Sequence, residues 1–207
     1  MTTLATGIDI LDRQLDGGIP SGSVVALKAP ASSNAELLLY QLTAARRSLY
    51  LTTVRSSAAV RDGMRMTKAP TGEPTIRELT GAEVLDQANR AIGRLSEDTT
   101  LIIDPLDPIE ERELSRFVTF VNDLQTHLQN TGAFAVLHCL DDGVPPDNRK
   151  YTLSAADVVF DLTVEVRGST LVNRLTVPKN RGGVPITEEI KLKLVDGVAV
   201  DVSRDIA

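Results

Sequence analysis

The 207 residues suffice for one well-packed domain and are marginal for two, and 42% of them are hydrophobic, as is usual for a globular protein. A net charge of −6 and a pI near 5.0 disfavour unaided binding to DNA or RNA, because an acidic surface repels phosphates. The single cysteine, Cys139, excludes an intramolecular disulfide, and no apolar run approaches the ~20 residues that span a bilayer. We therefore expect a soluble, cytoplasmic protein with no membrane contact.

The N-terminal third alternates helical and strand patterns. Thr6 is placed to cap a short helix whose apolar residues share one face, and Gly17-Gly18 end that helix. Apolar runs and helical spacings then predict a strand at 23–28, a helix at 35–46, a strand at 48–53 and a helix near 56–66. Such alternation favours a parallel sheet covered by helices.

The middle third continues this alternation. Thr80 is predicted to cap a helix that extends to about residue 95, with Glu83 as its capping-box partner. The other elements expected here are a strand at 75–79, a strand at 100–104, a helix from about 110 to 130 and a strand at 132–140. A polar segment follows, in which Arg149-Lys150 is expected on a solvated surface.

The last third changes character. The segments DVVFDLTVEV, TLVNRLTVPK and EEIKLKLV alternate apolar and polar residues, which is typical of antiparallel strands. The sequence thus predicts an α/β fold with a mainly parallel twisted sheet, flanked by helices and finished by antiparallel strands. We expect a single domain over 1–207, with a lead-in at 1–22, an α/β core at 23–140 and a β-rich part at 151–203.

The opening segment TGIDILDRQLDGGIPSGSVVAL resembles the start of the KaiC-like and RadA-like members of the RecA superfamily. The matching residues are Thr6, Gly7, Ile8, Leu11, Asp12, Gly17, Gly18, Ile19, Pro20, Gly22 and Ser23. The resemblance implies a RecA-like P-loop NTPase fold over nearly the whole chain. Only six of the 22 basic residues are lysines, and this preference for arginine in an acidic chain resembles haloarchaeal proteins.

In that family the next residues form the Walker A loop, G-x-x-x-x-G-K-[ST], in which the lysine reaches the outer phosphates and the hydroxyl holds Mg²⁺. Here Ala29 and Asn34 stand at the glycine positions, Ala35 at the lysine and Glu36 at the hydroxyl. A carboxylate ~4 Å from a phosphate charge is repelled by about 4 kcal/mol at an effective dielectric of ~20. We expect Mg-ATP binding to be weakened by at least about three decades.

A divergent use of the loop stays open as an alternative. Asn34 can adopt the positive φ that the lost glycine would require, and Ser32 and Ser33 can donate to an anion at the start of the following helix. ATP and Mg²⁺ are cofactors only under this alternative; otherwise no cofactor is expected.

Two further positions of the family pattern fall on the second strand and on the strand at 100–104. The second strand of KaiC-like ATPases commonly ends in glutamates that activate water, but Val54 and Arg55 follow it here, so the general base is absent. Asp104 stands at the Walker B position, as a vestige of Mg²⁺ binding or, by the interpretation we favour, as a cap of the next turn. Asp107 and Glu110 are expected as helix N-terminal charges.

Near the C-terminus, VPKNRGG resembles the Lys-x-Arg pair that KaiC-type rings project into a neighbouring subunit's nucleotide site. Lys179 and Arg181 occupy those positions, either to act in trans on an intact ATPase partner or as an ordinary basic turn.

No metal site is predicted. His138 and Cys139 are adjacent on a strand and so point to opposite faces, and His127 lies toward the end of a helix, where a surface role is ordinary.

The function predicted first is a non-catalytic, pseudo-ATPase member of the group, acting as a regulatory or scaffolding subunit through protein contacts. Its partner would be another protein, such as an active RecA/KaiC-like ATPase, and a homo-oligomer stays open. The alternatives are an ATP-binding protein with a divergent loop and a DNA-repair accessory of the recombinase-paralogue type. The acidic segment LDDGVPPDN argues against strand exchange.

Overall fold

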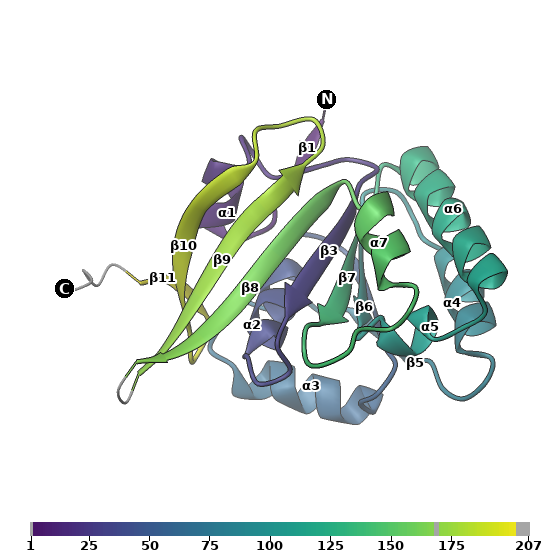
Figure 1. Ribbon diagram of the computed structural model, residues 1–207, viewed down its shortest axis with the longest axis horizontal. Coiled ribbons are helices and arrows are strands. Elements are labelled where there is room, and N and C mark those ends of the chain that lie inside the picture. The colour runs from purple at the N-terminus through teal and green to yellow at the C-terminus, as the bar shows by residue number, and fades with distance from the viewer. Residues whose placement is uncertain (1, 168–169, 202–207) are drawn as a thin grey trace.

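The computed structural model describes residues 2–167 and 170–201 (Figure 1). The strands are β1 (Thr3–Leu4), β2 (Ile19–Pro20), β3 (Val24–Ala29), β4 (Ser48–Thr52), β5 (Thr75–Glu78), β6 (Thr100–Asp104), β7 (Phe134–Leu140), β8 (Val158–Arg167), β9 (Thr170–Asn180), β10 (Ile186–Leu194) and β11 (Val198–Val200). The helices are α1 (Asp9–Gln14), α2 (Ala35–Leu42), α3 (Ser57–Met66), α4 (Val84–Ile92), α5 (Asp107–Glu110), α6 (Leu114–Thr131) and α7 (Arg149–Ala155).

One large sheet organises the molecule. Among the described residues its strand order is β11-β10-β9-β8-β3-β7-β6-β4-β5, and β1 and β2 form a separate antiparallel pair. The strands from β8 to β5 are mutually parallel, whereas β9, β10 and β11 add in antiparallel fashion beyond β8. The predicted fold class is therefore confirmed.

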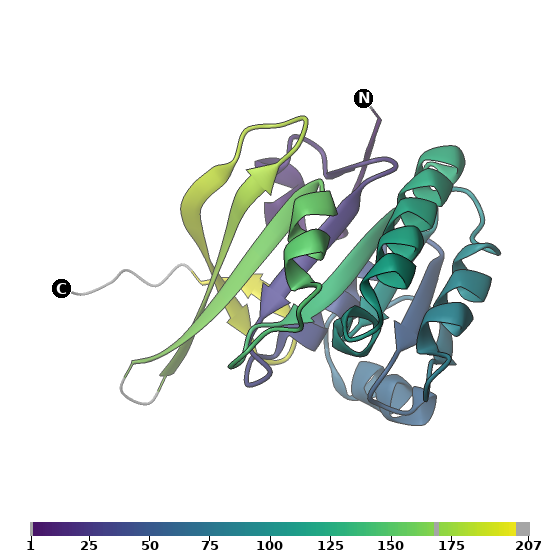
Figure 2. The same cartoon turned by 45° about the vertical axis from the view of Figure 1, so that its right-hand side comes forward.

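Apolar cores cover both faces of the sheet, as the helices in Figures 1 and 2 indicate. Alternate residues of β3 separate between them: Val25 and Leu27 pack with the cluster that holds α1, α2 and α3, while Val24 and Ala26 pack with α4, α5 and α6. Because β3 is buried on both faces, its first four residues form a continuous apolar run rather than an alternating one.

The N-terminal lead-in explains part of the sequence motif physically. The hydroxyl of Thr6 accepts a bond from the Ile8 N–H, and the Thr6 N–H donates to the Asp12 carboxylate. Gly18 has a φ of +118°, and a Cβ there would lie 2.2 Å from the Leu4 carbonyl oxygen. Only glycine fits this close approach between the two short strands.

Two predicted helices begin at other residues than expected. The helix expected from about 110 is divided, because the Glu113 side chain accepts from the Ser115 and Arg116 N–H groups and starts α6 afresh. The capping box at Thr80 was wrong: α4 begins only at Val84, since Gly81 has a left-handed φ of +73° that a helix cannot contain.

The prediction that Arg149 lies on a solvated surface was also wrong, because its side chain is buried. Arg149 starts α7, a helix that the sequence did not predict, and is only 4% exposed. Its guanidinium binds the Glu110 carboxylate through Nε at 2.8 Å and Asp107 at 2.9 Å, and Thr152 donates to the other Glu110 oxygen. Asp107 and Glu110 lie in the first turn of α5, as expected, and both are also partners of this arginine. We call these four residues, Asp107, Glu110, Arg149 and Thr152, the Arg149 cluster.

No helix in the described ranges is both long enough and apolar enough to cross a membrane.

Candidate functional site

A cavity of about 270 Å³ lies where the parallel strands β3, β4, β6 and β7 reach their carboxyl ends. Ligands of parallel α/β sheets bind at this edge, in the crevice beyond the strands. The residues that line the cavity are Pro30, Ala31, Ser33, Glu36, Val54, Arg55, Asp104, Pro105, His138 and Leu140.

The loop at 29–36 joins β3 to α2, so it keeps the place that a phosphate-binding loop would have. Three of its backbone donors are used within the chain. The Ala31 N–H donates to the Asp142 carboxylate, the Ser33 N–H to a carbonyl inside the loop, and the Ala35 N–H to the Ser33 hydroxyl at 3.3 Å. A carboxylate of the protein itself therefore occupies a donor that could face an anion.

The conformation of Asn34 differs from the one expected for this loop. Asn34 has a φ of −93°, so it does not take the left-handed conformation considered for a missing glycine, and its amide donates to the Leu194 carbonyl at 2.8 Å. Ser32 is exposed, and the Ser33 hydroxyl donates to Pro30 at 2.6 Å.

The two positions that would hold the Walker lysine and hydroxyl form the first turn of α2. The Ala35 methyl is buried, at 1% exposure, whereas Glu36 is half-buried and lines the cavity. The first turn of this helix thus presents a carboxylate to the cavity and no cation.

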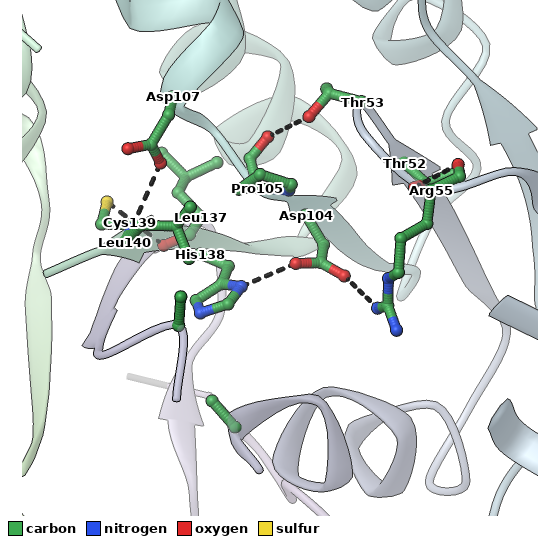
Figure 3. Close-up of polar contacts among 12 residues, drawn as sticks. Thr52, Thr53, Arg55, Asp104, Pro105, Asp107, Leu137, His138, Cys139 and Leu140 are labelled. Carbon is green, nitrogen blue, oxygen red and sulfur yellow. Dashed lines mark hydrogen bonds and ion pairs between the residues drawn. The ribbon is translucent and has the colours of Figure 1, made fainter. Parts of the chain in front are cut away.

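Asp104 is the centre of a buried polar network, and Figure 3 shows its bonds to His138 and Arg55. One carboxylate oxygen accepts from His138 Nδ1 at 2.6 Å, and the other accepts from Arg55 at 2.6 Å and from the Tyr50 hydroxyl. The favoured interpretation of Asp104 as a turn cap was therefore wrong, because its bonds run to three neighbouring segments. We call these four residues, Tyr50, Arg55, Asp104 and His138, the Asp104 cluster.

Electrostatics fixes the charge state of this cluster. Burial alone would raise the pKa of Asp104, but the hydrogen bond and charge of His138 and the charge of Arg55 outweigh it and hold that pKa at about 2. Burial and the neighbouring Asp104 raise the pKa of Tyr50, so its hydroxyl stays protonated and donates. Near neutral pH, Asp104 is therefore an anion that accepts every bond it makes.

Arg55 is a site residue that sequence reasoning missed, since it was noted there only for the lost general base. Its guanidinium also donates to the Tyr40 hydroxyl at 2.9 Å and lies over the Tyr40 ring. The sequence places Arg55 just after one strand and Asp104 at the end of another, but only the structure shows that these strands, β4 and β6, are parallel neighbours, which brings the two side chains within reach of each other.

His138 is the second residue that gains a role. As expected from strand alternation, Cys139 points to the opposite face, where burial raises the pKa of its thiol. The His138 side chain is only 9% exposed, and its Nε2 atom has no hydrogen-bond partner among the described residues. His127 lies elsewhere, with its Nε2 atom 3.4 Å from the Leu95 carbonyl oxygen. No three histidine, cysteine or acidic side chains in the described part of the chain are grouped to hold a metal ion.

Lys179 and Arg181 lie away from this cavity, at the end of β9 and just after it. The Lys179 ammonium donates to the Leu153 and Ser154 carbonyls, both at 2.9 Å, in the last turn of α7. Arg181 pairs with Asp157 at 3.2 Å. Both basic groups are thus engaged within their own chain.

Comparisons with known proteins agree with this architecture. A family model described as "Family of unknown function (DUF7125)" matches residues 3–207. No curated protein matches the sequence. Among solved structures, the KaiC-like protein PH0186 from the hyperthermophilic archaeon Pyrococcus horikoshii OT3 superposes with a TM-score of 0.77 at 16% identity, over 97% of this chain and 99% of that one. The chain belongs to the DUF7125 family, and its fold is that of a KaiC-like RecA protein.

Proposed function

We propose that this chain is a non-catalytic, pseudo-ATPase member of the KaiC-like group that acts as a regulatory or scaffolding subunit through protein contacts. One observation carries the proposal: the groups that would handle a Mg-triphosphate are replaced or already bonded within the chain. Asp104 is held by Arg55, Tyr50 and His138, and a loop N–H is held by Asp142.

The charges at the cavity support the same proposal. Glu36 places a carboxylate where the family has the Mg²⁺-binding hydroxyl, and repulsion from a phosphate ~4 Å away would cost about 4 kcal/mol at an effective dielectric of ~20. Arg55 is the one cation among the lining residues described, and its charge is balanced by Asp104 at 2.6 Å. A triphosphate would therefore meet no uncompensated positive charge there.

ATP binding through a divergent loop is the second candidate function. It would require Asp142 to release the Ala31 N–H and Asp104 to exchange its protein partners for Mg²⁺. A DNA-repair accessory role has no support from the cavity, and the acidic chain disfavours unaided DNA binding.

Titration calorimetry with Mg-ATP tests the proposal. For the natural protein we expect no saturable binding with a Kd below ~100 µM, because the loop has lost the groups that supply about a thousandfold of the affinity for Mg-ATP. The Ala35→Lys/Glu36→Thr double variant restores the lysine and the hydroxyl and serves as the matched control. Saturable binding by the natural protein tighter than ~100 µM would show that the divergent loop still holds nucleotide and would contradict the proposal.

The protein partner is the remaining part of the proposal. If Lys179 and Arg181 act in trans on an intact RecA/KaiC-like ATPase, they must first leave their bonds to α7 and Asp157. Alanine substitutions at both positions would then lower the ATPase rate of that partner, and an unchanged rate would remove this role.

A further inference from the structure

The cavity contains a buried nitrogen that the fold leaves unused. Asp104 is a carboxylate that accepts from His138 Nδ1 at 2.6 Å, so a neutral imidazole at this position is the tautomer with its proton on Nδ1. The Nε2 atom then presents its lone pair as an acceptor. The side chain is more than nine-tenths buried, and this atom has no partner among the described residues although His138 lines the cavity. Buried acceptors are normally bonded, so this one indicates a missing donor.

A second acceptor without a hydrogen-bond or ion-pair partner borders the same cavity. Among the described residues, the Glu36 carboxylate has no hydrogen bond or ion pair with the loop or with α2, and its negative charge helps to raise the pKa of Tyr40. Arg55 and Asp104 cancel each other as an ion pair. The charged groups lining the cavity therefore sum to about one negative charge, carried by Glu36.

The remaining wall is apolar. Pro30, Val54, Pro105 and Leu140 line the cavity beside the two acceptors, and Val54 is 70% exposed. Such a surface covers the body of a small molecule, while the acceptors fix the orientation of its polar end.

We propose that this cavity binds a small organic cation with N–H donors, of the amidinium or guanidinium class. One N–H would donate to His138 Nε2, and the cationic head would pair with the Glu36 carboxylate. Such a planar head offers several N–H donors in a fixed arrangement, which suits two separated acceptors. The inference rests on the proposed function, because a triphosphate would fill the same space with the opposite charge.

The experiment uses the fact that the chain has two histidines. A spectrum of the ¹⁵N-labelled imidazoles therefore contains His138 with His127 as an internal reference. We expect benzamidinium to move the His138 Nε2 resonance saturably, with a Kd of about 1 mM or tighter, and to leave His127 unchanged. Benzoate, which has the same ring and the opposite charge, should leave both unchanged.

A pair of matched variants assigns the charge. Glu36→Gln removes the carboxylate at the cavity, and we expect benzamidinium to bind at least about fivefold more weakly. Glu97→Gln makes the same change at an exposed position that does not line the cavity, and it should leave binding unchanged. A titration in which benzoate matches benzamidinium, or in which Glu36→Gln has no effect, would overturn the proposal.

The cation could be a free molecule or an arginine side chain of a partner protein. The capped peptide acetyl-Gly-Arg-Gly-amide, titrated in the same way, separates the two: binding of benzamidinium alone assigns a free ligand, and binding of the peptide assigns an arginine side chain. No saturable shift with either cation would overturn the inference. Mg-ATP in a third titration keeps the two proposals apart, because ATP binding contradicts the pseudo-ATPase function whatever the cations do.

Discussion

Two buried charge clusters lie at the carboxyl ends of β6 and β7, and they are completed to different degrees. In the Arg149 cluster, each of the three guanidinium nitrogens has an acceptor, and both Glu110 oxygens are bonded. In the Asp104 cluster, the carboxylate is fully bonded but His138 Nε2 is left without a partner beside a cavity.

This difference indicates that the Arg149 cluster has a structural role, whereas the Asp104 cluster belongs to a binding site. Removing charges from water costs free energy, and a buried network offsets this cost only when every charged member is bonded. The Arg149 cluster meets this condition, and it joins α5, β7 and α7. In the Asp104 cluster the charge of Asp104 is likewise balanced, by Arg55. However, His138 Nε2 has no partner among the described residues, and the Glu36 carboxylate lines the adjacent cavity. We interpret the Arg149 cluster as a staple of the fold and the Asp104 cluster as the remains of a nucleotide site adapted to another ligand.

The largest effect is expected for Arg149→Met. The substitution leaves Glu110, which is 0% exposed, as a buried carboxylate without its cation, and should lower the free energy of unfolding by about 3–5 kcal/mol. Urea denaturation followed by circular dichroism measures this loss.

The control for this prediction removes both charges. The Glu110→Leu/Arg149→Met double variant removes the fully buried carboxylate together with its cation and leaves only the partly exposed Asp107 without a partner, so it should recover much of the stability. A loss below about 1 kcal/mol for Arg149→Met alone would mean that the Arg149 cluster is not a staple.

A smaller loss is expected at the Asp104 cluster, and it depends on pH. The folded-state pKa of Asp104 is about 2, below the unfolded value of ~3.9, so its contribution of about 2–3 kcal/mol is present above pH ~4 and disappears as the pH falls toward 2. Asp104→Asn should remove that contribution at neutral pH.

Urea midpoints at several pH values between 2 and 7 check the sign. The difference between the natural protein and Asp104→Asn should shrink as the pH falls, because both then carry a neutral group at this position. A constant difference across that range would show that the ionised carboxylate does not stabilise the fold.

The sequence predicted the strands better than the clusters. The runs at β3, β6 and β7 are mostly apolar because parallel strands are covered on both faces, so they were located to within about two residues. Asp104 was correctly placed at the end of its strand. Its partners Arg55 and His138 lie 49 and 34 residues away, and they meet only because β6 lies between β4 and β7 in the sheet. That strand order is set by tertiary packing, which no local pattern records.

The same limit explains the error at Arg149. The polar segment before it is typical of a surface turn, and α7 has only seven residues, too few for a clear periodic pattern. Its burial depends on Glu110, 39 residues earlier in the chain. The local sequence around Arg149 therefore does not reveal that this arginine will be buried against a distant carboxylate.

The smallest effect is expected for Lys179→Ala. The ammonium donates to two carbonyls in the last turn of α7, where a cation also interacts favourably with the helix dipole, so its loss should cost about 0.3–1 kcal/mol. For a chain of this length that is a fall of roughly 1–4 °C in the Tm. Arg181→Ala is the matched control and should have less effect, because the Arg181 side chain is 58% exposed, its ion pair with Asp157 is at the surface, and it lies 3.5 Å from the Ser154 carbonyl. If Lys179 instead serves mainly a partner protein, its substitution would leave the Tm of the isolated chain unchanged and would alter only the activity of that partner.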